Sequence, residues 1–148
     1  MRIAIEEAQA GLAIGEQPFG TVITSKESIV CQTHSLKVST CDPTAHAETL
    51  AIRAASHKLQ RRTLPDCVVY TTCEPCPMCL GAMLNAGIKR LVMGARLSDL
   101  SANSVFSFGS YSAERFAAMV GWALQTDSGV LGEECIGLYR GTSASLTR

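Results

Sequence analysis

Hydrophobic residues change their spacing several times along the chain, and each change marks an expected element. A helical spacing runs through residues 2–13. Strand-like alternation follows in residues 20–24 and 28–32, and the polar sequence SKES between them predicts a hairpin turn. The beginning of the chain is therefore expected to fold as a helix followed by two adjacent strands.

A second helix is expected to open at Asp42-Pro43-Thr44, a sequence typical of helix caps, and to run to about Leu59. Small apolar residues recur along it at helical spacing. The residues expected to face the interior are Ala47, Leu50, Ala51 and Ala54.

Strand, helix and strand follow one another in the middle of the chain. Residues 67–71 are apolar and β-branched, which predicts a buried strand. Pro77 suits the first turn of a third helix that ends at Gly87, and residues 90–94 predict another strand. Because a crossover helix joins them, these two strands are expected to lie parallel in one sheet.

Weaker patterns continue beyond Ala95. They predict a helix at residues 112–120, a strand at 122–126 and a last helix at 133–139. The alternation of helices and strands places the chain in the α/β class and predicts an α/β/α sandwich.

Length and composition suit one domain. The chain has 148 residues, 47% of them hydrophobic, so we expect a single domain over residues 1–148 with a solvated, flexible tail at about 141–148. No apolar run approaches the roughly 18 to 20 residues of a membrane helix, and the amino terminus is amphipathic and acidic. A cytoplasmic location without membrane partners is therefore expected.

Charge and cysteine content narrow the function classes. Lys and Arg number 13 and Asp and Glu number 13, so the net charge is zero and no overall field attracts nucleic acid or anionic lipid. A small, neutral or weakly charged substrate fits this balance, and a nucleic-acid partner is not expected. Seven cysteines are an odd number, and the close pair beside prolines favours a metal or catalytic use in a reducing compartment over disulfides.

That close pair, Cys76 and Cys79, forms a C-x-x-C sequence within TCEPCPMC, directly after a predicted strand and at the start of a predicted helix. Three kinds of site suit such a pair: a redox dithiol, a structural zinc site and a catalytic zinc site. Cys73 is the candidate for a fourth ligand of a structural site, but it is expected to be a packed side chain.

The sequence TAHAE favours the catalytic zinc site, because His46 supplies a third ligand and Glu48 a proton carrier. His46 and Glu48 are two positions apart, which would separate them on a helix. Side chains in a first turn lean toward the amino terminus, however, so both can reach a point just beyond the helix end. Cys76 and Cys79 can reach the same point from a second helix start.

With these residues in place, HAE and PCPMC resemble the H-x-E and P-C-x-x-C motifs of the cytidine-deaminase-like superfamily of zinc-dependent deaminases. The similarity runs from about Ile3 to Gly94, and the sequences PFG, DPTAHAE and CEPCPMC resemble most closely its guanine deaminase and tRNA adenosine deaminase branch. The resemblance implies a three-layer α/β/α sandwich around a five-stranded mixed sheet of order 2-1-3-4-5. It also implies a homodimer and hydrolytic removal of an exocyclic amino group.

The resemblance also assigns roles to residues. His46, Cys76 and Cys79 would bind one Zn²⁺ per chain, and Glu48 would be the catalytic proton carrier. The residues expected to line the substrate pocket are Phe19, Ser35, Ala47, Thr72, Glu74 and Pro75. Ser35 stands where members of this branch typically have asparagine, so the pocket is expected to differ at that wall.

Several functions stay open at this level. Deamination of a free nucleobase, nucleoside or related amino-heterocycle is the leading hypothesis, with guanine as the first candidate. The alternatives are a tRNA-specific adenosine deaminase, a cytosine deaminase and a zinc-stabilised binding module without catalysis. A tRNA-editing enzyme is expected to have a Lys- and Arg-rich terminal helix, whereas residues 133–139 contain two acidic residues and no basic ones.

Overall fold

The computed structural model describes residues 1–100 and 108–140, so the tail expected at 141–148 lies outside the described residues. The helices are α1 (Arg2–Ala13), α2 (Ala47–Leu59), α3 (Pro77–Asn85), α4 (Leu97–Leu100), α5 (Ala113–Met119) and α6 (Gly132–Gly137). The strands are β1 (Gly20–Ser25), β2 (Ser28–His34), β3 (Cys67–Cys73), β4 (Arg90–Ala95) and β5 (Gln125–Asp127).

The strands form one mixed sheet in the order β2-β1-β3-β4-β5. Strand β1 pairs antiparallel with both β2 and β3, whereas β3 with β4 and β4 with β5 are parallel pairs. The strand order implied by the resemblance and the parallel pair predicted from the strand-helix-strand pattern are both confirmed.

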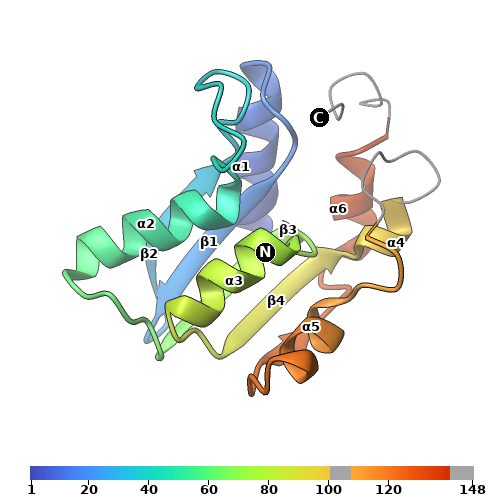
Figure 1. The fold of residues 1–148 in the computed structure, drawn as a ribbon. Helices are drawn as coiled ribbons and strands as arrows, with labels where there is room; N and C mark the ends of the chain where they lie inside the picture. The colour runs from blue at the N-terminus through green and yellow to red at the C-terminus, as the bar shows by residue number, and fades with distance from the viewer. Residues whose placement is uncertain (101–107, 141–148) are drawn as a thin grey trace.

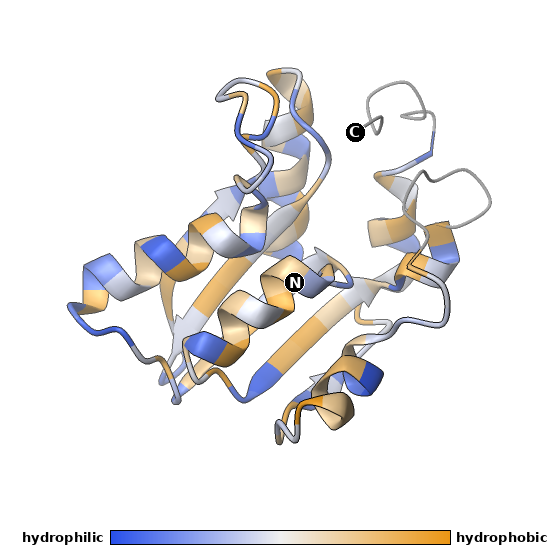
Figure 2. Ribbon diagram, viewed as in Figure 1, coloured by the Kyte–Doolittle hydropathy of each residue, from blue (hydrophilic) through white to orange (hydrophobic). Residues whose placement is uncertain are grey.

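Helices cover both faces of this sheet and enclose two separate cores (Figure 1). One core packs α2, α3 and the start of α5 on the sheet, with Ala51, Leu80, Met83 and Ala113 among its buried residues. The other packs α1 and α6 on the opposite face, where Ala8 and Cys135 are buried. Figure 2 shows that the central strands are hydrophobic along most of their length, as expected for strands covered on both sides. The three-layer α/β/α sandwich is therefore confirmed.

Helix α2 begins at Ala47, later than the predicted start at residues 42–44. The Asp42 carboxylate accepts hydrogen bonds from the backbone N–H and the hydroxyl of Thr44, at 2.8 and 2.7 Å, and so forms a local turn of its own. His46, with φ −73° and ψ 151°, is extended and becomes the N-cap residue. The cap-like sequence therefore precedes the helix without starting it.

The buried face of α2 also differs from the prediction. Ala47, Ala51 and Ala55 are fully buried, whereas Leu50 and Ala54 are half-buried. The prediction of the buried face was therefore correct for Ala47 and Ala51 and wrong for Leu50 and Ala54. Because the buried side chains are alanines, α2 can lie close to the sheet.

The carboxyl-terminal part contains the expected elements at shifted positions. The last strand, β5, starts at Gln125 and not at residue 122 as predicted. Trp122 lies before the strand and donates its indole N–H to the Ile88 carbonyl at 3.0 Å. Helix α3 ends at Asn85, and Gly87 follows with a φ of 67°. The short helix α4 was not predicted.

Within the described part of the chain, no helix is long and apolar enough to cross a membrane.

Strand β4 and helix α6 approach so closely that Gly94 has no room for a side chain. A Cβ at this position would lie 2.2 Å from the Cys135 sulfur and 2.9 Å from the Thr72 carbonyl oxygen. We expect Gly94→Ala to lower the free energy of unfolding by about 1–3 kcal/mol, as for other overpacked cores.

The matched control is Gly137→Ala in α6, where an added Cβ meets nothing within 4 Å. This change should be neutral or stabilise by up to about 1 kcal/mol, because alanine favours helices. Denaturant unfolding of both variants measures the difference. Equal stabilities would contradict the close approach of β4 and α6.

Candidate active site

The candidate site lies where the amino-terminal ends of α2 and α3 meet on the same face of the sheet (Figure 1). His46 is the N-cap residue of α2 and Cys76 is the N-cap residue of α3, and both have extended backbones. Glu48 and Cys79 lie in the first turns of the same two helices. The expected convergence of side chains at two helix ends is therefore observed.

Three possible ligand atoms form a compact triangle. The Nδ1 atom of His46 lies 3.7 Å from the Cys76 sulfur and 3.6 Å from the Cys79 sulfur, and the two sulfurs are 3.6 Å apart. Zinc bonds of about 2.0–2.3 Å at tetrahedral angles put donor atoms about 3.6–3.8 Å apart. The donor set and its spacing therefore fit one zinc ion with a fourth position for water.

The two thiols differ strongly in acidity. The hydrogen bond from Cys79, with a further one from His46, lowers the pKa of Cys76 to about 4 despite burial. The hydrogen bond to Cys76, burial and the Glu48 charge raise the pKa of Cys79. The hydrogen bond to Cys76 also raises the pKa of His46. A divalent cation shared by both sulfurs stabilises the second thiolate, because it supplies the positive charge that the protein groups alone do not.

Glu48 lies beside this triangle and is 5% exposed. Its Oε2 atom is 3.5 Å from the Cys79 sulfur, and its Oε1 atom is 3.5 Å from the Thr71 hydroxyl. Burial, followed by the negative charge of Cys76, raises the pKa of the Glu48 carboxyl. A buried carboxyl group beside the possible ligands can act as both proton acceptor and proton donor.

A hollow opens over these residues. Its lining consists of Gln17, Phe19, His46, Glu48, Glu74, Cys76 and Leu97. Phe19 and Glu74 were expected there, whereas Gln17 and Leu97 were not. Gln17 directly precedes the PFG sequence and could have been included with it, but Leu97 carries no comparable signal.

Ser35 and Ala47 were also expected in the pocket, and both are buried behind its surface. The Ser35 N–H donates to the Phe19 carbonyl at 3.0 Å, so Ser35 lies directly beside a wall of the hollow. The Ala47 carbonyl accepts a hydrogen bond from the Thr33 hydroxyl at 2.8 Å. A substrate contact by either residue stays a prediction.

Thr72 and Pro75, the remaining expected pocket residues, bond to the protein itself. The Thr72 hydroxyl accepts the Gly20 N–H at 3.2 Å and lies 3.2 Å from the Tyr139 hydroxyl. The Pro75 carbonyl accepts the Tyr111 hydroxyl. These bonds fix the wall of the site, and a role for either residue in binding substrate stays a prediction.

Glu74 lines the hollow and also connects three segments of the chain. One carboxylate oxygen accepts the Leu97 N–H at 3.1 Å, and the other accepts the Ala113 N–H at 2.8 Å. Arg96 lies 3.5 Å from the same carboxylate. Glu74 therefore holds the start of α4 and the start of α5 against the site, a role that the sequence did not predict.

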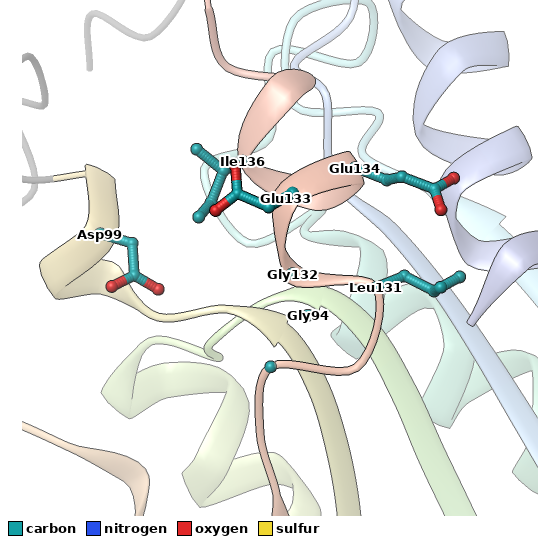
Figure 3. A pocket seen from close by; sticks show the side chains of 8 residues that line it. Gly94, Asp99, Leu131, Gly132, Glu133, Glu134 and Ile136 are labelled. Carbon is teal, nitrogen blue, oxygen red and sulfur yellow. The ribbon is translucent and has the colours of Figure 1, made fainter.

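A second hollow, of about 580 Å³, lies between α4 and α6 around Gly94, away from the possible zinc ligands (Figure 3). Figure 3 shows that the side chain of Glu134 points away from those of Asp99 and Glu133. Each of these three carboxylates has a partner: Arg2, the Arg96 N–H and Arg140, respectively. This hollow is larger but contains no group of converging catalytic side chains, so the chemistry belongs to the His46 site.

Fold and site together are those of a zinc-dependent deaminase. The family model for the cytidine and deoxycytidylate deaminase zinc-binding region matches residues 1–95, so the chain belongs to this family.

Relatives within the family act on different substrates. The tRNA-specific adenosine deaminase of Haemophilus influenzae is 39% identical in an alignment 140 residues long that covers 91% of this chain and 76% of the relative. The guanine deaminase of Bacillus subtilis is 42% identical over 97 residues, which are 66% of this chain and 60% of the relative. Among solved structures, a guanine deaminase from Nitrosomonas europaea superposes with a TM-score of 0.83 at 26% identity, over 95% of this chain and 81% of that one.

The family match confirms the expected family, and together with the cluster of His46, Cys76 and Cys79 it confirms zinc as the cofactor. The Haemophilus enzyme matches more of the chain than the Bacillus guanine deaminase does. The relatives therefore include tRNA-specific adenosine deaminases as well as guanine deaminases, so they do not single out guanine, which was the leading expectation. The expectation that nucleic acid is not a partner finds no support in them.

Purified protein should contain one zinc ion per chain, because His46, Cys76 and Cys79 are the described residues whose ligand atoms cluster within 4.8 Å. Cys79→Ser should reduce zinc binding by a factor of about 10 or more, since the thiolate contributes most of the affinity. Elemental analysis after dialysis measures the content.

The control is Cys73→Ala, a change at a cysteine that is 1% exposed and packs in the core with Ala8 and Cys135. This variant should keep one zinc ion per chain. If Cys73→Ala lost zinc while Cys79→Ser kept it, Cys73 would be the ligand and the assignment of Cys79 would be wrong.

Proposed function

We propose that this protein is a zinc-dependent aminohydrolase that replaces the exocyclic amino group of a nucleobase with oxygen and releases ammonia. The observation that supports this function best is the buried Glu48 carboxylate beside a three-ligand zinc site with one open position. A redox dithiol needs neither His46 nor Glu48, and a structural zinc site has four protein ligands.

In this reaction bound zinc is a Lewis acid that makes hydroxide from water available at neutral pH. Glu48 accepts the proton of that water and delivers it to a ring nitrogen of the substrate, while the oxygen adds to the neighbouring carbon. Glu48 then transfers the second proton of the water to the departing amino group, and the carbon–nitrogen bond breaks to give ammonia. One carboxylate therefore acts first as base and then as acid.

The surrounding residues orient the base. Phe19 presents an aromatic ring to the hollow and packs against Tyr139, with ring centroids 5.4 Å apart. An aromatic wall of this kind favours a flat heterocycle. Gln17 and Glu74 add polar groups beside that wall.

Adenosine in tRNA is the first candidate substrate, because the tRNA deaminase relative extends over 91% of the chain. Guanine is the second candidate, because the protein lacks the excess positive charge that would attract a polynucleotide. Helix α6 contains Glu133 and Glu134 in its first turn and no basic residue in its last. The net charge of zero adds no attraction for a polynucleotide.

Assembly into a homodimer and a cytoplasmic location stay predictions.

Replacement of Glu48 by glutamine should separate catalysis from zinc binding. Glu48→Gln keeps the size of the side chain but cannot carry the proton, so turnover should fall by a factor of at least about 10² while zinc remains. Ammonia release and zinc content are measured on the same sample.

Glu133→Gln is the matched control, because Glu133 is an exposed carboxylate in α6 outside the site. It should keep normal turnover. Near-normal turnover of Glu48→Gln would refute the role proposed for this residue, whereas no turnover by the wild type on any substrate would favour a zinc-stabilised binding module.

A substrate panel decides between the candidates. Inosine formation in tRNA is measured beside ammonia release from guanine, guanosine, adenine, cytosine and cytidine. We expect kcat/KM for tRNA to exceed that for each free base or nucleoside. The panel is repeated with Ser35→Asn, because Ser35 borders the Phe19 wall and is expected to alter recognition there.

A preference for guanine with no inosine in tRNA would replace the first candidate by the second. If Ser35→Asn leaves the order of kcat/KM values unchanged, Ser35 has no part in recognition.

A further inference from the structure

The segment between β2 and α2 forms one border of the site and contains a tight turn at residues 37–41. The Thr40 N–H donates to the Leu36 carbonyl at 3.1 Å, and the Cys41 N–H donates to the Val38 carbonyl at 3.3 Å. In such a turn the first N–H groups have no acceptor within the turn itself. The N–H groups of Val38 and Ser39 therefore need acceptors from another part of the chain.

Glu16 supplies both acceptors. Its Oε2 atom accepts the Val38 N–H at 3.0 Å, and its Oε1 atom accepts the Ser39 N–H at 2.7 Å. Glu16 is 1% exposed, although glutamate is rarely buried. Among the described residues no Lys or Arg forms an ion pair with it, so N–H groups stabilise its charge instead.

Burial alone would raise the pKa of Glu16, but the hydrogen bonds from Ser39 and Val38 outweigh burial and hold the pKa below its ordinary value. The side chain is therefore ionised at neutral pH. Hydrogen bonds to an ionised acceptor are about twice as strong as those between neutral groups.

This contact connects two segments that border the hollow. Glu16 directly precedes Gln17, and Gln17 and Phe19 line the hollow. Ser35, at the start of the other segment, donates its N–H to the Phe19 carbonyl at 3.0 Å. Residues 16–19 and 35–39 are therefore joined at two points, one at the hollow and one at Glu16.

The same border leads to the zinc ligands. The Leu36 N–H donates to the Ala45 carbonyl at 3.0 Å, and Ala45 directly precedes His46. A shift of residues 35–39 would therefore alter the Phe19 wall and act on the residue before a zinc ligand.

We propose that Glu16 is a positioning residue of the substrate pocket, whose carboxylate holds residues 38 and 39 and thereby fixes the Phe19 wall relative to His46 and Glu48. The proposal rests on the proposed deaminase function for its effect on substrate, whereas the hydrogen bonds can be tested without substrate. Glu16 is not a catalytic residue, because it touches the turn and not the hollow.

The test compares Glu16→Gln with Glu6→Gln, a matched change at an exposed carboxylate of α1. Glutamine keeps the size of the side chain, but only its carbonyl oxygen accepts hydrogen bonds and its NH₂ group donates, so at least one of the Val38 and Ser39 N–H groups loses its acceptor. Amide exchange and ¹H–¹⁵N shifts are recorded on zinc-loaded protein. Zinc content, kcat and KM are measured on the same samples with whichever panel substrate the wild type converts.

In Glu16→Gln at least one of the Val38 and Ser39 amides should exchange about tenfold faster or more, and the Ser35 and Phe19 amide shifts should move. One zinc ion per chain should remain. The ratio kcat/KM should fall by about 10- to 100-fold, mainly through KM, because the wall that orients the base is displaced. Glu6→Gln should match the wild type in every measurement.

Unchanged exchange at Val38 and Ser39 in Glu16→Gln would overturn the proposal. So would faster exchange with unchanged KM and Phe19 shift, because Glu16 would then be only structural. If the wild type converts no panel substrate, the proposed function fails, and the Ser35 and Phe19 shifts alone decide on Glu16.

If Glu16→Gln does not fold, the milder Ser39→Ala takes its place, because it removes only the hydrogen bond from the Ser39 hydroxyl to Glu16. Its KM should rise by about two- to fivefold, as expected for one lost hydrogen bond of this strength. A wild-type KM in Ser39→Ala would then overturn the proposal.

Discussion

The site depends on one constraint: two helices on the same face of the sheet must begin at the same point in space. His46 and Cys76 are N-cap residues with extended backbones, so their side chains point past the helix ends toward each other. Helix α2 can lie close to the sheet because Ala47, Ala51 and Ala55 are fully buried there. The helix ends also supply partial positive charge next to the Cys76 and Cys79 sulfurs, which favours their deprotonation when a metal ion binds. Metal ligands, proton carrier and pocket all follow from this arrangement.

Two buried carboxylates outside the ligand set maintain the borders of the site. Glu74 accepts N–H groups from Leu97 and Ala113, and Glu16 accepts those of Val38 and Ser39. Each is a buried side chain whose two oxygens satisfy backbone N–H groups from distant segments. These bonds matter because part of the pocket wall, including Gln17, Phe19 and Glu74, lies outside the helices that carry the possible metal ligands.

Sequence reasoning found the ligand set and the sheet for different reasons. The convergence of His46, Cys76 and Cys79 followed from their types and spacing at helix starts, whereas the strand order came only from the family resemblance. The start of α2 was misplaced because Asp42 bonds to Thr44 locally instead of capping the helix. The roles of Glu16 and Glu74 were not predicted, because their partners are backbone N–H groups far away in the sequence. Substrate choice was not predictable from the motifs, because the relatives that match this chain include enzymes with different substrates.

X-ray absorption at the zinc K edge of the purified protein tests the central claim most directly, since it distinguishes an open catalytic site from a closed structural one. The account predicts two sulfur neighbours at about 2.3 Å, one histidine nitrogen at about 2.0–2.1 Å and one further light atom from water at a similar distance. That light-atom shell should change when a substrate analogue is added. A shell of three or four sulfurs, with Cys73 as an additional ligand, would contradict the account, because no position would remain for the water that the reaction consumes.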